Sequence, residues 1–96
     1  MGVNDGLMAV GTTSVQLLPA RFGKRLDYSI VATAAANYSI QRGESLAVDK
    51  QGVYLVGIGG SWSESSDAGV RCFQGPIQII SDAAAGTVAF SERIME

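Results

Sequence analysis

Acidic side chains are the main candidates for reactive chemistry, because the sequence contains no histidine. Serine and cysteine triads that use an imidazole base are therefore excluded, and the commonest partner of a zinc-bound cysteine is missing. Nine Asp and Glu residues remain, and Glu64 and Asp67 form the one close pair, inside a serine-rich stretch. Two solvated loop acids are the favoured interpretation, with a weak calcium contact and an acid–base pair as alternatives.

A glycine-rich segment, GIGGS at residues 57–61, follows an apolar run and so resembles the start of a phosphate-binding loop. Such loops present backbone N–H groups from a following helix, and the P-loop form also needs a lysine. The residues that follow here are serines and acids, with no lysine. The segment is therefore predicted to be a strand-ending turn or a bulge.

The single cysteine, Cys72, lies between Arg71 and Phe73 in an apolar stretch. One cysteine excludes an internal disulfide. A lone cysteine at alternating spacing is typical of a small buried hydrophobic side chain, and this is the prediction for Cys72. A reactive thiol beside the arginine is the alternative.

The basic residues and the tryptophan are the other candidates for contacts. Arg21, Lys24 and Arg25 lie within five positions, which indicates a solvated turn or, alternatively, a contact with an acidic protein surface or with nucleic acid. A formal net charge of −2 argues against a dedicated nucleic-acid-binding protein. Trp62 either folds back over a small core or projects as an anchor in an interface.

Composition predicts one globular domain. The chain has 96 residues, of which 47% are apolar and 17% charged. A chain of this length buries roughly 60–65% of its unfolded surface, so self-association or attachment to a larger body is expected to add stability. No apolar run reaches the roughly 18–20 residues of a bilayer span, and no secretion signal is recognised, so we expect a soluble, unexported protein from a reducing compartment.

Alternating polar and apolar residues predict short β-strands at intervals of about ten residues. The clearest strand is residues 27–33, where Tyr28, Ile30 and Ala32 share one face. Residues 53–58 are almost wholly apolar and predict a strand covered on both faces. The other predicted strands are residues 13–18, 38–41, 70–73, 77–81 and 87–91. The predicted loops are residues 34–37 and 61–69.

These elements predict an all-β fold. Seven or eight short strands without a helical stripe favour a small antiparallel β-sandwich or barrel, similar to a jelly roll, over residues 13–96. Residues 1–12 contain three glycines and no sustained period. They are predicted to form a flexible N-terminal arm, with an edge segment of the sheet as the alternative.

A series of strand and turn residues carries a family resemblance. It comprises SVQLLPA at residues 14–20, Arg25, Tyr28-Ser29-Ile30, Tyr38-Ser39-Ile40, Arg42-Gly43, Tyr54-Leu55, Gly60-Ser61, Gly75-Pro76-Ile77 and Gly86-Thr87-Val88. This order resembles small tailed-phage virion accessory proteins, the group of head decoration or cement proteins. The resemblance spans residues 14–92. Arg21 stands where the group often has asparagine, and Ala32-Thr33 where it often has Asn-Thr.

The resemblance implies a virion structural protein, commonly a homotrimer, made in the host cytoplasm and seated on the capsid surface. Such a capsid decoration or cement module binds the major capsid protein at subunit junctions through non-covalent contacts. It implies no enzyme activity, no cofactor, no metal, no direct nucleic-acid contact and no membrane contact. The residues that we expect in the interface are Leu7, Met8, Val10, Arg21, Lys24, Arg25 and Trp62. The alternative is a tail or spike binding module that recognises a host-surface ligand through Trp62 and Asp67.

Overall fold

The computed structural model describes residues 2–48, 50–66 and 71–95 of the chain, and these form eight β-strands. The strands are β1 (Gly2–Val10), β2 (Val15–Leu18), β3 (Arg25–Ala32), β4 (Tyr38–Arg42), β5 (Val53–Leu55), β6 (Ser61–Ser65), β7 (Ile77–Ser81) and β8 (Gly86–Ile94). In β3, Tyr28, Ile30 and Ala32 are buried while Val31 is exposed. The alternation in the sequence therefore gives β3 one inward face.

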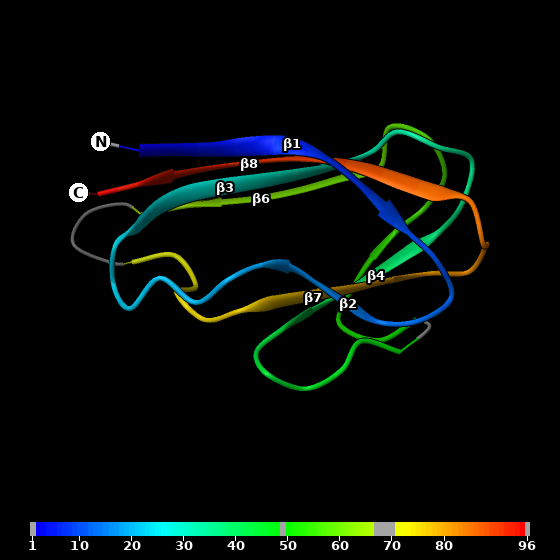
Figure 1. Ribbon diagram of the computed structural model, residues 1–96, viewed down its shortest axis with the longest axis horizontal. Coiled ribbons are helices and arrows are strands. Elements are labelled where there is room, and N and C mark those ends of the chain that lie inside the picture. Colours follow the sequence, from blue (N-terminus) through cyan, green and yellow to red (C-terminus); the bar gives the residue numbers. More distant parts are fainter. Residues whose placement is uncertain (1, 49, 67–70, 96) are drawn as a thin grey trace.

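Two antiparallel sheets of four strands are stacked face to face (Figure 1). Their strand orders are β1-β8-β3-β6 and β2-β7-β4-β5. Strand β1 pairs with β8, β2 with β7, β3 with β6 and β4 with β5, so the chain is one long antiparallel ribbon folded into two layers. This is the arrangement of a jelly roll, and it confirms the prediction of a small all-β sandwich.

The core lies between the two sheets and is built mainly from large aliphatic side chains and two tyrosines. Burial of one such aliphatic side chain contributes about 1.5–3 kcal/mol. The most deeply buried members are Leu18, Tyr28, Ile30, Tyr38, Ile40, Ile77, Ile79 and Val88. They come from both sheets, so the core holds the two layers together.

The N-terminal residues form an edge strand, and the prediction of a flexible arm is wrong. Strand β1 pairs with β8 without interruption from Gly2, opposite Ile94, to Val10, opposite Gly86. Val10 is 1% exposed and Met8 packs against the core. These contacts and the ladder of backbone hydrogen bonds fix the segment in the sandwich. The edge-segment alternative is therefore confirmed.

The serine-rich stretch is a strand and not a loop. Ser61–Ser65 forms β6, which pairs with β3. The serines of β6 are exposed, whereas Trp62 and Glu64 are partly buried. Alternation is present, but its inward members are a tryptophan and an acid rather than aliphatic residues, so the pattern was not evident. Asp67 lies outside the described residues.

Two other strand predictions differ from the structure. Strand β5 ends at Leu55, and the turn beyond it leaves Val56 and Ile58 67% and 69% exposed. The predicted strand at residues 70–73 is not formed at residues 71–73, and residue 70 lies outside the described residues. In this segment the carbonyl of Phe73 accepts a hydrogen bond from the guanidinium of Arg25.

Candidate functional site

Four loops meet at one end of the sandwich, at the right of Figure 1, and we call this surface the loop end. Asp82 is its one charged residue. Alanine and glycine make up most of the rest, and the uncharged polar residues are Thr12, Thr13, Ser14, Thr33 and Asn37. The four loops are residues 11–14, 33–37, 56–60 and 82–85.

Asn37 fixes three of these loops relative to one another. Its Oδ1 accepts a hydrogen bond from the backbone N–H of Gly57 at 3.0 Å, and its Nδ2 donates to Oδ2 of Asp82 at 2.9 Å. The backbone N–H of Asn37 donates to Oδ1 of the same carboxylate at 3.0 Å. The fourth loop joins through the N–H of Ser81, which donates to the carbonyl of Gly11. The exposed Asp82 carboxylate is therefore held in a fixed orientation by Asn37.

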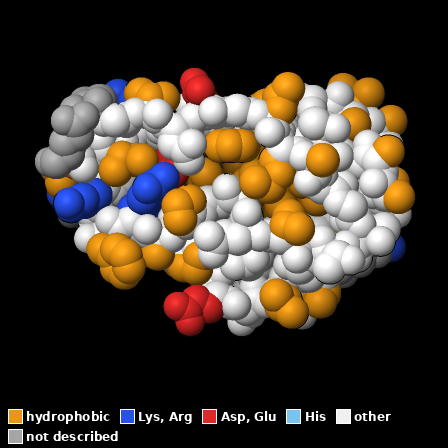
Figure 2. Space-filling model, viewed as in Figure 1, with side chains coloured by type: hydrophobic (Ala, Val, Ile, Leu, Met, Phe, Trp, Pro, Cys, Tyr) orange, Lys and Arg blue, Asp and Glu red, His pale blue; other side chains and the backbone are white. Residues whose placement is uncertain are grey.

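The loop end exposes apolar side chains. Val56 and Ile58 are 67% and 69% exposed, and they flank Gly57 in a turn where Gly57 and Gly59 have positive φ. On the face shown in Figure 2, most Lys and Arg side chains lie at the opposite end, and one basic side chain is visible at the right margin. A surface with two large aliphatic side chains and one exposed carboxylate, which is hydrogen-bonded to Asn37, can contact another protein surface.

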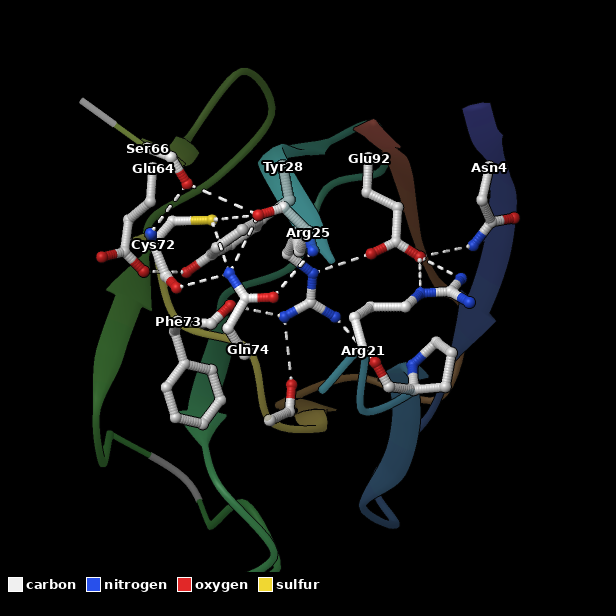
Figure 3. A network of polar contacts seen from close by, with 12 residues as sticks. Asn4, Arg21, Arg25, Tyr28, Glu64, Ser66, Cys72, Phe73, Gln74 and Glu92 are labelled. Carbon is white, nitrogen blue, oxygen red and sulfur yellow. Dashed lines mark hydrogen bonds and ion pairs between the residues drawn. The ribbon is translucent and has the colours of Figure 1, made fainter. Parts of the chain in front are cut away.

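The opposite end of the sandwich contains a buried charge network around Arg25 (Figure 3). Arg25 is fully buried at the start of β3. Its Nε donates to Oε2 of Glu92 at 2.8 Å, and its Nη2 donates to the carbonyl of Pro19 at 2.7 Å. Its Nη1 donates to the carbonyls of Phe73 and Gly75. One guanidinium thus joins strand β8 to two irregular segments.

Glu92 is the acid of this network and is also fully buried. Besides Arg25, it accepts hydrogen bonds from Nδ2 of Asn4 at 3.0 Å and from Nε of Arg21 at 3.0 Å, and it forms an ion pair with Arg21. Burial alone would raise the pKa of Glu92, but the hydrogen bonds from Arg21, Asn4 and Arg25 outweigh it and lower that pKa. Glu92 is therefore an ionised structural acid, unsuited to accept a proton near neutral pH.

The contacts of Glu92 should determine how the free energy of unfolding changes at acid pH. Because the folded pKa of Glu92 is lowered, its stabilising contribution is present above the ordinary value of 4.5 and is lost as the pH falls through the folded pKa. Removal of Arg21 should raise the folded pKa and move this loss to higher pH. Denaturant unfolding of Arg21→Ala between pH 2 and 7 tests this. Lys24→Ala, an exposed charge removal in the same turn, should leave the profile unchanged, and equal profiles for both variants would contradict the assignment.

A second polar cluster lies where β6 faces β4. Nε1 of Trp62 donates to Oη of Tyr28 at 3.0 Å, and Oη of Tyr28 donates to Glu64. The Arg42 guanidinium lies 5.6 Å from the Trp62 ring centroid and 3.4 Å from Glu64. Burial raises the pKa of Tyr28 and the hydrogen bond to Glu64 raises it further, so the phenol remains a donor. The cluster ties the two sheets together at this edge.

Trp62 folds back over the core and does not project from the surface. It packs against the core cluster and donates its N–H within the molecule. Of the two alternatives for Trp62, the structure therefore shows the one in which the side chain folds back over the core. Outside this edge, Asp27, Ser29, Ser63 and Ser65 line a shallow polar cleft of about 310 Å³ on β3 and β6.

The residues expected in the interface are spread over the molecule. Leu7 is 70% exposed on β1, and Lys24 is exposed in its turn. Val10 and Arg25 are buried within the chain, so neither is available to a partner and these two expectations are wrong. Met8 and Trp62 pack against the core, and Arg21 is paired with Glu92.

The basic turn is not a solvated turn, because two of its three side chains form the network with Glu92. Glu92 lies 67 positions from Arg25 in sequence, and strand register alone brings them together. The loop end was also missed, since Val56 and Ile58 were placed in a buried strand. The glycines on either side of Ile58 were the available signal for a turn.

Two smaller predictions are confirmed. Cys72 is 5% exposed, as expected for a small buried hydrophobic side chain. The glycine-rich segment is a strand-ending turn, and it leads into β6 rather than into a helix.

Comparisons with protein-family models, with curated proteins and with solved structures found no match for this chain. Within residues 2–48, 50–66 and 71–95, no group of three or more Cys, Asp or Glu side chains is placed to hold a metal ion. In the same residues no helix is long and apolar enough to cross a membrane.

Proposed function

We propose that this protein is a structural component of a phage virion, a decoration or cement module that docks on the outer surface of the head. The sequence resemblance suggests this class, and a compact jelly roll is a fold that capsid proteins use. The observation that carries the proposal is the loop end, where Val56 and Ile58 are exposed on a surface whose one charged residue is Asp82, hydrogen-bonded to Asn37.

The proposed mechanism is burial of the loop end against the major capsid protein at subunit junctions. Full burial of one aliphatic side chain is worth about 1.5–3 kcal/mol, so Val56 and Ile58 alone give a weak contact. A homotrimer presents three such loop ends together, and linked weak contacts bind far more tightly than one. Many copies on one head would then resist separation of the capsid subunits.

A binding measurement with Ile58→Asp tests this proposal. A charge at the centre of the contact must be desolvated, so we expect the apparent affinity for undecorated heads of the parent phage to fall at least about tenfold. The matched control is Phe22→Asp, which places the same charge on a 90% exposed side chain at the opposite end. Cosedimentation with heads gives both affinities. Equal binding by the two variants would refute docking through the loop end.

The second candidate function is recognition of a host-surface ligand by a tail or spike module. The cleft beside Asp27 and Ser63 favours it, because a carboxylate and hydroxyl groups can bind sugar hydroxyls. Trp62 faces the core and so offers that cleft no aromatic platform. A glycan array probed with the wild type and with Asp27→Asn separates the two functions. A ligand lost in the variant would favour recognition over docking.

A further inference from the structure

Strand β1 has one free side over its whole length of nine residues. In an antiparallel ladder, alternate residues turn their N–H and C=O groups away from the neighbouring strand. In the part of the chain that the structure describes, the backbone of β1 is hydrogen-bonded to β8 alone. Figure 1 shows β1 along the margin of its sheet, with β8 beside it. A row of unpaired backbone groups is therefore open to a further strand.

The other three sheet edges are each protected. Strand β5 has three residues. Strand β2 has four, with a register shift between Gln16 and Leu18, and Pro19 follows it. Strand β6 has five and carries the inward-pointing acid Glu64. Short length, irregular register, proline and inward charge are the devices that prevent edge-to-edge pairing.

Strand β1 has none of these devices along its regular register with β8. Its one charge, Asp5, points outward, and the neighbouring outward side chains Val3 and Leu7 are 62% and 70% exposed. We propose that two copies of this chain pair antiparallel through β1, about a two-fold axis at Leu7. The two four-stranded sheets that begin with β1 would then form one continuous sheet.

The register follows from the side chains of β1. With the axis at Leu7, the exposed leucines of the two copies face each other and Asp5 lies opposite Ala9 of the second copy. The two aspartates are then roughly 14 Å apart, beyond the screening length of about 8–10 Å. An axis at Gly6 would bring them to about 7–8 Å and set each Leu7 against an aspartate. The separation of the two aspartates and the contact between the two leucines both favour an axis at Leu7 over one at Gly6.

This pairing is independent of docking through the loop end, since it uses a sheet edge and the loop end uses loop residues. A second copy fits this edge better than an unrelated strand, because residues 4–10 of each copy supply the backbone hydrogen-bonding partners of residues 4–10 of the other. This two-fold contact is separate from the three-fold contacts of the proposed homotrimer, so the two together would give a hexamer.

Oligomeric mass tests the pairing. Light scattering after gel filtration at about 100 μM should show that Leu7→Lys halves the mass of the wild-type particle, because two lysines would meet at the axis. Val3→Lys is the control, since Val3 is similarly exposed on the same face but lies outside residues 4–10. A monomeric wild type, or an oligomer whose mass Leu7→Lys leaves unchanged, would overturn the proposal.

Cross-linking tests the register. In a Cys72→Ser background, Leu7→Cys should form a covalent dimer on mild oxidation, because opposed residues in an antiparallel pair have Cα atoms about 4.5–5.5 Å apart, within disulfide range. Asp5→Cys should stay monomeric on a denaturing gel, since its separation of roughly 14 Å is too long. Equal cross-linking at both positions, or none at Leu7→Cys, would contradict the assigned pairing.

Discussion

Replacing Arg25 by methionine is expected to lower the free energy of unfolding by about 3–5 kcal/mol, because it removes the fully buried one of the two guanidiniums that pair with the buried Glu92 carboxylate. Arg25 is fully buried and its Nε lies 2.8 Å from Oε2 of Glu92. The carbonyls of Pro19 and Phe73 also lose their donor. Urea unfolding followed by Trp62 fluorescence measures the loss.

The control is Arg42→Met, which removes a 42% exposed guanidinium from its ion pair with Glu64. Exposed pairs contribute about 0–1 kcal/mol, so this variant should remain close to the wild type. If Arg25→Met does not fold, Arg25→Lys keeps the charge but cannot reproduce the hydrogen bonds that the guanidinium makes to Glu92 and to three backbone carbonyls, and its loss of stability can be measured instead. Similar losses of unfolding free energy in the Arg25 and Arg42 variants would show that the buried network stabilises the fold no more than the exposed ion pair does.

Replacing Gly52 by alanine is expected to cost about 2–4 kcal/mol, the sum of backbone strain and overpacking. Gly52 has φ of +70°, and a Cβ atom placed there would lie 2.1 Å from the carbonyl oxygen of Ile40. That atom belongs to the backbone of β4, which pairs with both β5 and β7. The clash can be relieved only by displacing the ladder. Thermal unfolding with global analysis gives the change.

Gly57→Ala is a matched control for this substitution. Its φ of +69° equals that of Gly52 within one degree, but nothing lies within 4 Å of its Cβ position. This variant therefore has the backbone strain but not the clash. The strain alone should cost about 1 kcal/mol of unfolding free energy. Equal losses of unfolding free energy in Gly52→Ala and Gly57→Ala would mean that the nearby carbonyl of Ile40 adds nothing to the cost of a side chain at position 52.

Strands with aliphatic inward faces could be predicted from the sequence. In β3, buried Tyr28, Ile30 and Ala32 alternate with polar or exposed residues, and in β7 buried Ile77 and Ile79 stand on either side of Gln78; the predicted bounds of both strands agree closely. Strand β6 was missed because its inward side chains are Trp62 and Glu64, whose roles depend on Tyr28 and Arg42 from other strands. A pattern of alternating polar and apolar residues cannot reveal a strand whose inward side chains make polar contacts with other strands.

The candidate sites depend on contacts between distant segments, which explains why sequence reasoning found little of them. Arg25 was expected to be solvated because nothing local indicates its acid, which enters from the last strand. The loop end is assembled from four separate loops through Asn37 and Asp82, 45 positions apart. Exposure of Val56 and Ile58 follows from the end of β5, which sequence placed three residues too late.

The central claim, that this chain docks on the outer surface of a phage head, is tested most directly by a cryo-EM map of the proposed parent virion. The account predicts jelly-roll density on the outer head surface at junctions between capsid subunits, with the turn that carries Val56 and Ile58 facing the capsid. A virion without this chain, or density in which that turn faces solvent while another surface contacts the capsid, would contradict it.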